Sequence, residues 1–312
     1  MSRIHEALKK AEQERAANQG GMEPSYVASQ TIATPDLLQE SQAAIATDMM
    51  PPTNGLGAPA FSNALSVDSL LANTVQMEWK PEPGTMLFLN GDDNVRGAEE
   101  FRTLRSRLYH MREKMPLRKI LVTSALPKEG KSFTSANLAQ VIVRQNGRRV
   151  LLIDADLRSP RLHHMLGTIS HPGLADYLRG RSDEFSIMQR GQLENLFFIP
   201  SGSEIGNPAE LVGNGRLKVL LQKVEPLFDW IIVDSPPAIP VSDAGMLAKA
   251  CDGVLMVVRS NATPFDLARK AREEFPDQAL VGVVLNGTQE KTQPYSRYYY
   301  EMYEKKPAVP KL

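Results

Sequence analysis

The sequence has little of several features that would point to particular classes of protein. It contains one cysteine among 312 residues, so no internal disulfide can form. Lysine plus arginine and aspartate plus glutamate both number 36, so no net charge attracts nucleic acid or an anionic membrane. No apolar run approaches the ~18 residues of a membrane-spanning helix, and the first residues lack the apolar core of a signal peptide. These absences predict a cytoplasmic protein without nucleic acid as a partner, whose recruitment to the inner face of a membrane would depend on another protein.

Aromatic residues are also scarce, at 6% of the chain, yet five of the eight tyrosines fall within nine residues near the C-terminus. They are Tyr295, Tyr298, Tyr299, Tyr300 and Tyr303. Three consecutive rings cannot share one face of a helix or strand, so packing does not explain the cluster. Exposed phenol groups can have a function if they are phosphorylated. We therefore expect residues 289–312 to form a tyrosine-rich tail that carries phosphoacceptors.

Composition divides the rest of the chain into three expected parts. Residues 1–16 have apolar residues at helical spacing among charged ones, which predicts a short amphipathic helix. This helix either docks on a partner or is an only marginally stable segment without a function. Residues 17–85 are rich in Ser, Ala, Gln, Asn and Pro and carry seven acidic residues against one lysine, which predicts a disordered acidic linker. Residues 86–288 alternate strand-like and helix-like segments and form the expected domain.

Six apolar runs in this domain predict buried strands. They are residues 119–123, 149–154, 195–200, 229–234, 253–258 and 280–286. Continuous Val, Ile and Leu runs are typical of strands that helices cover on both faces. The pattern therefore predicts an α/β fold with a doubly wound, mostly parallel sheet of the P-loop NTPase type.

The first of these strands leads into a phosphate-binding loop at residues 125–132, Ala-Leu-Pro-Lys-Glu-Gly-Lys-Ser. In such a loop, backbone N–H groups and the following helix N-terminus cradle phosphates, a lysine reaches the β and γ phosphates, and a serine hydroxyl helps to hold Mg²⁺. The alternative is a chance Gly-Lys-Ser at a helix start, and the alanine in place of the usual first glycine restricts the backbone. The predicted ATP-binding residues here are Ala125, Lys128, Glu129, Gly130, Lys131, Ser132 and Phe133.

Aspartates follow two other predicted strands. Asp154 and Asp156 end one strand, and Asp234 ends another. The carboxyl ends of parallel strands meet at one edge of a sheet, so these three acids should converge beside the phosphate loop. Buried carboxylates need a cation, and Mg²⁺ is the natural one beside phosphates. For Asp156, a helix N-cap or an ion pair with Arg158 is the alternative.

Taken together, the phosphate loop, Asp-x-Asp-x-Arg at 154–158, Asp-x-Pro-Pro at 234–237 and the tyrosine-rich tail resemble the bacterial tyrosine kinases of exopolysaccharide and capsule biosynthesis. The resemblance covers about residues 86–303. Related partitioning and division-site ATPases share the first and third motifs but lack the tail, and their signature lysine is Leu126 here. The first dozen residues also resemble kinases of the exosortase-associated subgroup.

The resemblance implies roles for individual residues. It implies that Lys131 binds phosphate, that Ser132, Asp156 and Asp234 serve the Mg²⁺ site, and that Lys131, Asp154 and Asp156 are catalytic. Asp154 would orient or deprotonate the incoming tyrosine hydroxyl. Asn286, after the last predicted strand, would read adenine, with a simple turn residue as an equally weighted alternative.

A helix containing Glu99, Arg102 and Arg105 at spacings of three resembles the subunit-contact helix through which this family forms rings. Pairing within the helix is the alternative. The resemblance also implies a separate membrane-anchored chain-length-determinant protein as partner and a tyrosine phosphatase as antagonist. We therefore expect a Mg-ATP-dependent tyrosine autokinase that phosphorylates its own tail between subunits. Two rival hypotheses are a nucleotide-switched positioning ATPase without kinase activity and a scaffold that binds through its exposed tyrosines.

Overall fold

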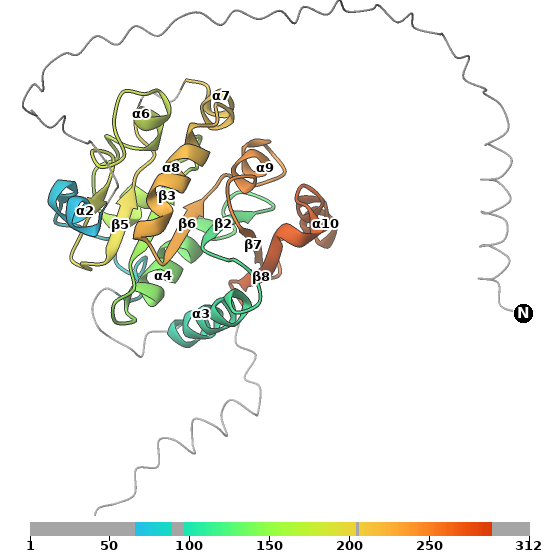
Figure 1. Ribbon diagram of the computed structural model, residues 1–312. Coiled ribbons are helices and arrows are strands. Elements are labelled where there is room, and N and C mark those ends of the chain that lie inside the picture. Colours follow the sequence, from blue (N-terminus) through green and yellow to red (C-terminus); the bar gives the residue numbers. More distant parts are fainter. Residues whose placement is uncertain (1–65, 89–96, 204–205, 289–312) are drawn as a thin grey trace, which may run out of the picture. The chain divides into compact units, whose positions relative to one another are not determined.

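The computed structural model describes residues 66–88, 97–203 and 206–288 of the chain. The predicted N-terminal helix at residues 1–16 and the tyrosine-rich tail lie outside these ranges, as does most of the predicted linker. Figure 1 shows the described elements as a sheet surrounded by helices. Within the described ranges, no helix is both long and apolar enough to cross a lipid bilayer.

The described residues form one eight-stranded sheet in the order β1-β4-β5-β3-β6-β2-β7-β8. Its strands are β1 Val75–Gln76, β2 Lys119–Ser124, β3 Val150–Asp154, β4 Gln189–Arg190, β5 Leu196–Ile199, β6 Trp230–Asp234, β7 Gly253–Arg259 and β8 Leu280–Asn286. Neighbouring strands run parallel except β4 and β5. All six predicted strands are confirmed, and so is the predicted fold class. The two short strands β1 and β4 escaped prediction because two residues carry no periodic pattern.

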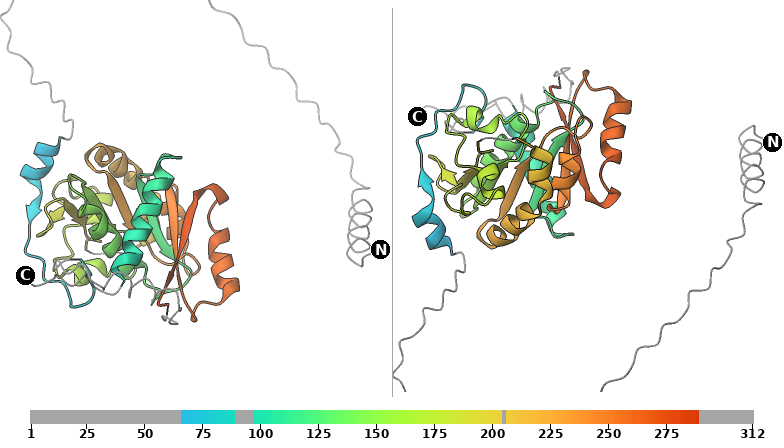
Figure 2. Two further views of the ribbon diagram at one scale, coloured as in Figure 1. Left: turned by 90° about the horizontal axis from the view of Figure 1, so that it is seen from below. Right: turned by 90° about the horizontal axis from the view of Figure 1, so that it is seen from above.

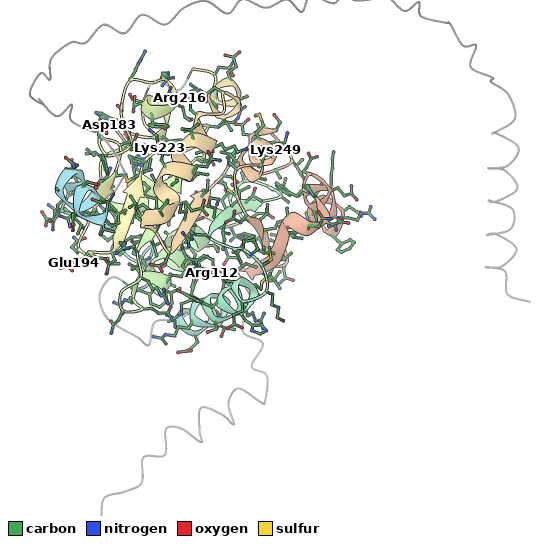
Figure 3. All side chains as sticks on the ribbon, in the orientation of Figure 1. Arg112, Asp183, Glu194, Arg216, Lys223 and Lys249 are labelled. Carbon is green, nitrogen blue, oxygen red and sulfur yellow. The ribbon has the colours of Figure 1, made fainter. Side chains whose placement is uncertain are left out.

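Helices cover both faces of the sheet. They are α2 Val67–Asn73, α3 Ala98–Arg112, α4 Lys131–Val143, α5 Leu162–Leu166, α6 Leu174–Leu178, α7 Pro208–Gly213, α8 Arg216–Val224, α9 Asp243–Ala248 and α10 Phe265–Glu273, with short 3₁₀ turns at Glu225–Leu227 and Asp277–Ala279. In both views of Figure 2 the blue segment with α2 and β1 and the red α10 lie at opposite ends of the sheet. Charged side chains such as Asp183, Glu194 and Lys249 project from the surface (Figure 3).

The sheet has a hydrophobic core on each of its two faces, and alternate residues of a strand belong to different cores. On β3, Leu151 and Ile153 join the core beneath α6, α8 and α9, whereas Val150 and Leu152 join the core beneath α3 and α4. Successive strand residues point to opposite faces, so a continuous apolar run fills both cores. This arrangement is the physical reason why these strands lack an alternating polar pattern.

The domain begins about twenty residues earlier than expected. Helix α2 lies inside the predicted linker, starts with a capping box between Ser66 and Ser69, and buries Leu70 completely. Trp79 is 2% exposed and its ring packs edge-on against Phe198 at 6.3 Å. The linker prediction is therefore wrong for residues 66–85, because a polar average composition concealed a few apolar residues that the core requires.

Candidate active site

The phosphate loop connects the end of β2 to the first turn of α4. Gly130 precedes α4 with a φ of 98°, a left-handed value that favours glycine. A side chain there would also have to displace Asn286, because a Cβ on Gly130 would lie 2.0 Å from Asn286 Nδ2. Ala125 is fully buried in the core beneath α8 and is not among the described residues with positive φ, so alanine fits where the motif usually has glycine. The thirteen-residue helix α4 directs its N-terminal N–H groups toward the loop, as an anion site requires.

The strand order brings the three predicted aspartates to this loop. β6 pairs with β2 on one side and with β3 on the other, and Asp154 and Asp234 are register partners. Lys131 Nζ contacts Asp156 Oδ2 at 2.7 Å, and both groups are buried. Burial works against the charged ammonium of Lys131, but Asp234 and Asp156 outweigh burial and raise its pKa. The lysine is thus held charged among carboxylates.

Asp154 and Asp234 are completely buried, and each keeps one carboxylate oxygen without a hydrogen-bond partner. Burial and the proximity of Asp234 raise the pKa of Asp154 to about 8, although the Leu162 N–H bonded to its other oxygen works the opposite way. Burial also raises the pKa of Asp234 to about 6, against the influence of Lys131 and the Ser132 and Ser135 hydroxyls. Buried, unpartnered carboxylate oxygens are rare because they lose their hydration. The two unpartnered oxygens are therefore suited to a cation that binds together with a nucleotide.

Mg²⁺ is compatible with this donor set, but the protein alone does not cage it. No three His, Cys, Asp or Glu side chains in the described ranges are grouped as a metal site. Mg²⁺ characteristically uses one or two carboxylates and completes its shell with waters and phosphates. Asp234 Oδ2 and the Ser132 hydroxyl are the groups that would hold it, and bound Mg²⁺ would neutralise phosphate charge. The metal roles of Ser132, Asp156 and Asp234 remain predictions.

The structure gives Asp156 a local turn contact and an ion pair, but neither is the helix N-cap or the Arg158 pair of the alternative interpretation. Its Oδ1 accepts the Ser159 N–H at 3.0 Å, a local turn contact, while Oδ2 pairs with Lys131. Arg158 does not pair with Asp156. Its guanidinium instead donates two hydrogen bonds, of 2.7 and 3.0 Å, to the buried Asp243 at the start of α9. That pair joins the end of β3 to α9 and was missed because its partners are 85 residues apart.

Other predicted nucleotide residues make contacts within the protein. Asn286 Nδ2 donates to the Glu129 carbonyl at 2.9 Å, and Asn286 Oδ1 accepts the Gly287 N–H at 2.8 Å. This side chain therefore links β8 to the phosphate loop, and its reading of adenine remains a prediction. The Phe133 ring packs against Phe101 of α3 at 6.0 Å, and Lys128 is exposed.

The expected subunit-contact residues also have partners inside the chain. Glu99 and Arg102 form the ion pair within α3 that was the alternative interpretation. Arg105 donates from Nη1 to the Val141 carbonyl of α4 at 2.7 Å. Arg105 therefore anchors α3 to α4, and the role of the three residues in assembly stays a prediction.

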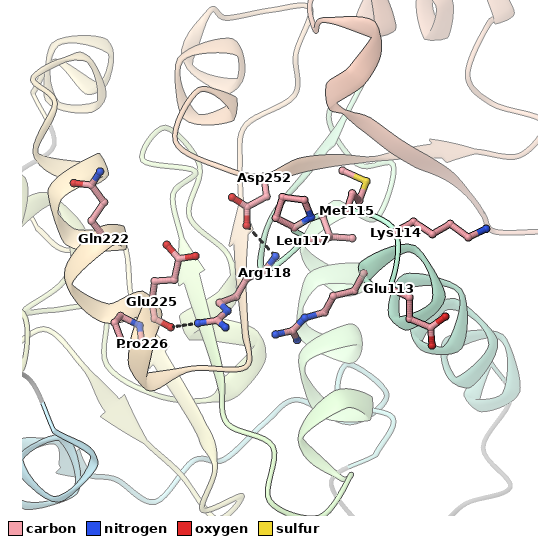
Figure 4. A pocket seen from close by; sticks show the side chains of 11 residues that line it. Glu113, Lys114, Met115, Leu117, Arg118, Gln222, Glu225, Pro226 and Asp252 are labelled. Carbon is pink, nitrogen blue, oxygen red and sulfur yellow. Dashed lines mark hydrogen bonds between the residues drawn. The ribbon is translucent and has the colours of Figure 1, made fainter.

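Figure 4 shows a pocket of about 720 Å³, which lies at the opposite end of β2 from the phosphate loop. It is lined by residues before β2 and β7, whereas the phosphate loop follows the opposite end of β2. Two of its charged residues already have partners in the protein: Asp252 accepts the Arg118 N–H at 2.9 Å, and Arg118 donates to the Glu225 carbonyl at 2.9 Å. The pocket volume therefore does not identify the active site.

Comparisons with known proteins agree with this geometry. The AAA domain family matches residues 120–266. The tyrosine-protein kinase YwqD of Bacillus subtilis is 35% identical over 205 residues, which are 65% of this chain and 85% of YwqD. The tyrosine-protein kinase Wzc of Salmonella typhimurium is 31% identical over 70% of this chain, but the match spans only 31% of Wzc.

The kinase domain of the Escherichia coli tyrosine kinase ETK has a similar solved structure, with a TM-score of 0.61 and 27% identity. The match covers 70% of this chain and 91% of that domain. The chain is thus similar in sequence and in fold to proteins of one named activity, while the exosortase-associated subgroup remains a prediction. This chain belongs to the bacterial tyrosine-protein kinase family.

Proposed function

We propose that this chain is a Mg-ATP-dependent tyrosine autokinase that phosphorylates its own tyrosine cluster at 295–303, mainly between subunits of a ring. Through a separate membrane-anchored chain-length-determinant protein, it would regulate exopolysaccharide polymerisation or export from the cytoplasmic side. A tyrosine phosphatase would reverse the modification. The observation that carries the proposal is Lys131 held charged among three buried aspartates beside a phosphate loop, in a chain that also carries a tyrosine cluster.

The chemistry follows from these groups. A tail tyrosine oxygen forms a bond to the γ-phosphorus, the bond from that phosphorus to ADP breaks, and the phenol proton leaves. Lys131 stabilises the phosphoryl charge, which is where most of the rate in phosphoryl transfer arises. Asp154 is the proposed proton acceptor, because its pKa of about 8 lies closer than that of an ordinary carboxylate to the phenol value of about 10. It can accept the proton only in its ionised form, which is the minority form at neutral pH.

Chain connectivity allows the tail to approach a phosphate loop. Strand β8 ends at Asn286, whose side chain contacts the loop, and the tyrosine cluster begins nine residues later at Tyr295. Nine extended residues span at most about 30 Å. The tail could therefore reach its own site or that of a neighbouring subunit, and the family resemblance favours the neighbour.

A mixing experiment tests kinase activity and its direction together. One chain carries Lys131→Met with the tail intact, and the other carries Tyr→Phe at all five tail positions with an intact site. After incubation with Mg-ATP, intact-mass measurement should show added phosphates on the Lys131→Met chain only. Phosphate on wild type alone, and on neither chain of the mixture, would show transfer within one subunit. Consumption of ATP by wild type without any gain in mass would support the positioning ATPase instead.

A further inference from the structure

We propose that Glu129 is a positioning residue, whose buried carboxylate joins Thr263 and Arg259 in a clamp that holds the phosphate loop in its binding conformation. Its side chain then serves neither phosphate nor metal, although it lies in the middle of the phosphate-binding motif. The proposal rests on the proposed use of ATP at this site. Its test reads nucleotide binding and loop protection, so it can fail independently of kinase activity.

Both carboxylate oxygens of Glu129 are directed into the protein. The residue is only 3% exposed, although two neighbouring loop residues are exposed. Its Oε2 accepts the Leu126 N–H at 2.6 Å, which closes the loop on itself, and its Oε1 accepts the Thr263 hydroxyl. A buried carboxylate with two short charge-assisted hydrogen bonds is held firmly in one orientation. Each of the two oxygens thus has a partner within the protein.

The second half of the clamp is the connection between β7 and α10. Thr263 Oγ1 accepts the Arg259 N–H at 3.1 Å, so its hydroxyl hydrogen is left for Glu129. Arg259 Nη1 donates to the Lys128 carbonyl at 3.0 Å. The sequence Thr263-Pro264-Phe265-Asp266 predicts a threonine-capped helix start, but α10 has Pro264 at its N-cap and no side-chain cap. The Thr263 hydroxyl is used by the phosphate loop instead.

Lys128 gives the clamp a physical purpose. It has a φ of 66°, one of two described residues other than glycine in the left-handed region. An L-residue with a long side chain disfavours this conformation, so the loop needs neighbouring contacts to stay in it. The clamp provides them on both sides of Lys128, through the Leu126 N–H, the Lys128 carbonyl and Glu129 itself. Asn286 adds a fourth contact from β8 to the Glu129 carbonyl.

The apparent affinity for nucleotide is proportional to the fraction of molecules whose loop is in the binding conformation. A loop that leaves this conformation more often therefore binds nucleotide more weakly. Loosening the clamp should therefore weaken binding while leaving the saturated enzyme nearly unchanged. A direct role of Glu129 at the phosphates or the metal would instead lower turnover at saturation. This difference separates positioning from catalysis.

The test compares Thr263→Val, which removes the hydroxyl at nearly constant volume, with Thr263→Ser, which keeps it. We expect Thr263→Val to raise the dissociation constant for Mg-ADP about tenfold, the effect of losing one hydrogen bond to a charged group. Turnover at saturating ATP should stay within about twofold, and Thr263→Ser should resemble wild type in both. Equal affinity in Thr263→Val and wild type would overturn the proposal.

Two further measurements keep the test decisive. Because glycine accepts the left-handed conformation, Lys128→Gly introduced into Thr263→Val should recover part of the lost affinity. Without nucleotide, the Leu126 amide should exchange its hydrogen faster in Thr263→Val than in Thr263→Ser. Unchanged Leu126 exchange, or loss of turnover at saturation in Glu129→Gln with normal affinity for ADP, would show that Glu129 does not act through the clamp.

Discussion

The raised pKa of Asp154 predicts that the active site destabilises the folded protein as pH rises. Between its usual pKa of 3.8 and about 8, the folded protein binds this proton more tightly than the unfolded chain does. Stability from this group is therefore complete at low pH and is lost as pH rises toward 8. Asp154→Asn removes the titration while keeping an oxygen that can accept the N–H of Leu162, which bonds Asp154 at 3.0 Å.

The magnitude follows from the two pKa values. A tenfold change in proton affinity corresponds to about 1.4 kcal/mol, so the Asp154 penalty should grow by about 2 kcal/mol between pH 6 and pH 8. Asp234 has a pKa of about 6, so it is largely ionised over most of this pH range. It is also present in both proteins.

Urea denaturation of wild type and Asp154→Asn at pH 6 and pH 8, with a chelator and without nucleotide, measures this difference. The advantage of the variant should increase by about 2 kcal/mol at the higher pH. Glu194→Gln is the matched control, because it removes one carboxylate from the exposed surface. An advantage of Asp154→Asn that stayed constant, or shrank, as pH rose would refute the reasoning.

Three other predictions concern the domain boundary, the phosphate loop and the tail. Leu70→Ala should lower the free energy of unfolding by about 2–5 kcal/mol, because Leu70 is 0% exposed. Leu71→Ala should lower it by under about 1 kcal/mol, because Leu71 is 37% exposed. Equal losses of unfolding free energy in urea denaturation would place α2 outside the folded domain. Gly130→Ala should abolish ADP binding in calorimetry because its Cβ would lie 2.0 Å from Asn286 Nδ2, whereas Gly147→Ala, at a similar positive φ in open space, should bind normally. Each tail phosphate adds about −1.5 to −2 charges, which the three aspartates would repel if the tail enters a neighbour's site as proposed. Phosphorylation should therefore shift sedimentation toward smaller assemblies, and identical distributions would contradict this.

Local sequence was sufficient wherever the signal was short in range or strongly periodic. The apolar runs predicted six strands, and Gly-Lys-Ser after the first of them predicted the loop and the start of α4 at Lys131. The positions of Asp154 and Asp234 at strand ends also followed, because parallel strands align their carboxyl ends. The boundary at residue 86 failed because Leu70 and Trp79 are isolated apolar residues whose importance appears only when they are buried.

The sequence by itself determined the layered fold, the phosphate loop and the edge of the sheet where the aspartates meet, because strand periodicity and loop motifs are written in neighbouring residues. Tertiary structure alone decided which partners polar side chains take when those partners lie far apart in the sequence. It paired Lys131 with Asp156, Arg158 with Asp243 and Glu129 with Thr263, across separations of 25, 85 and 134 residues. Hydrogen bonds act over about 3 Å, so the choice among many candidate partners is made only after the chain has folded.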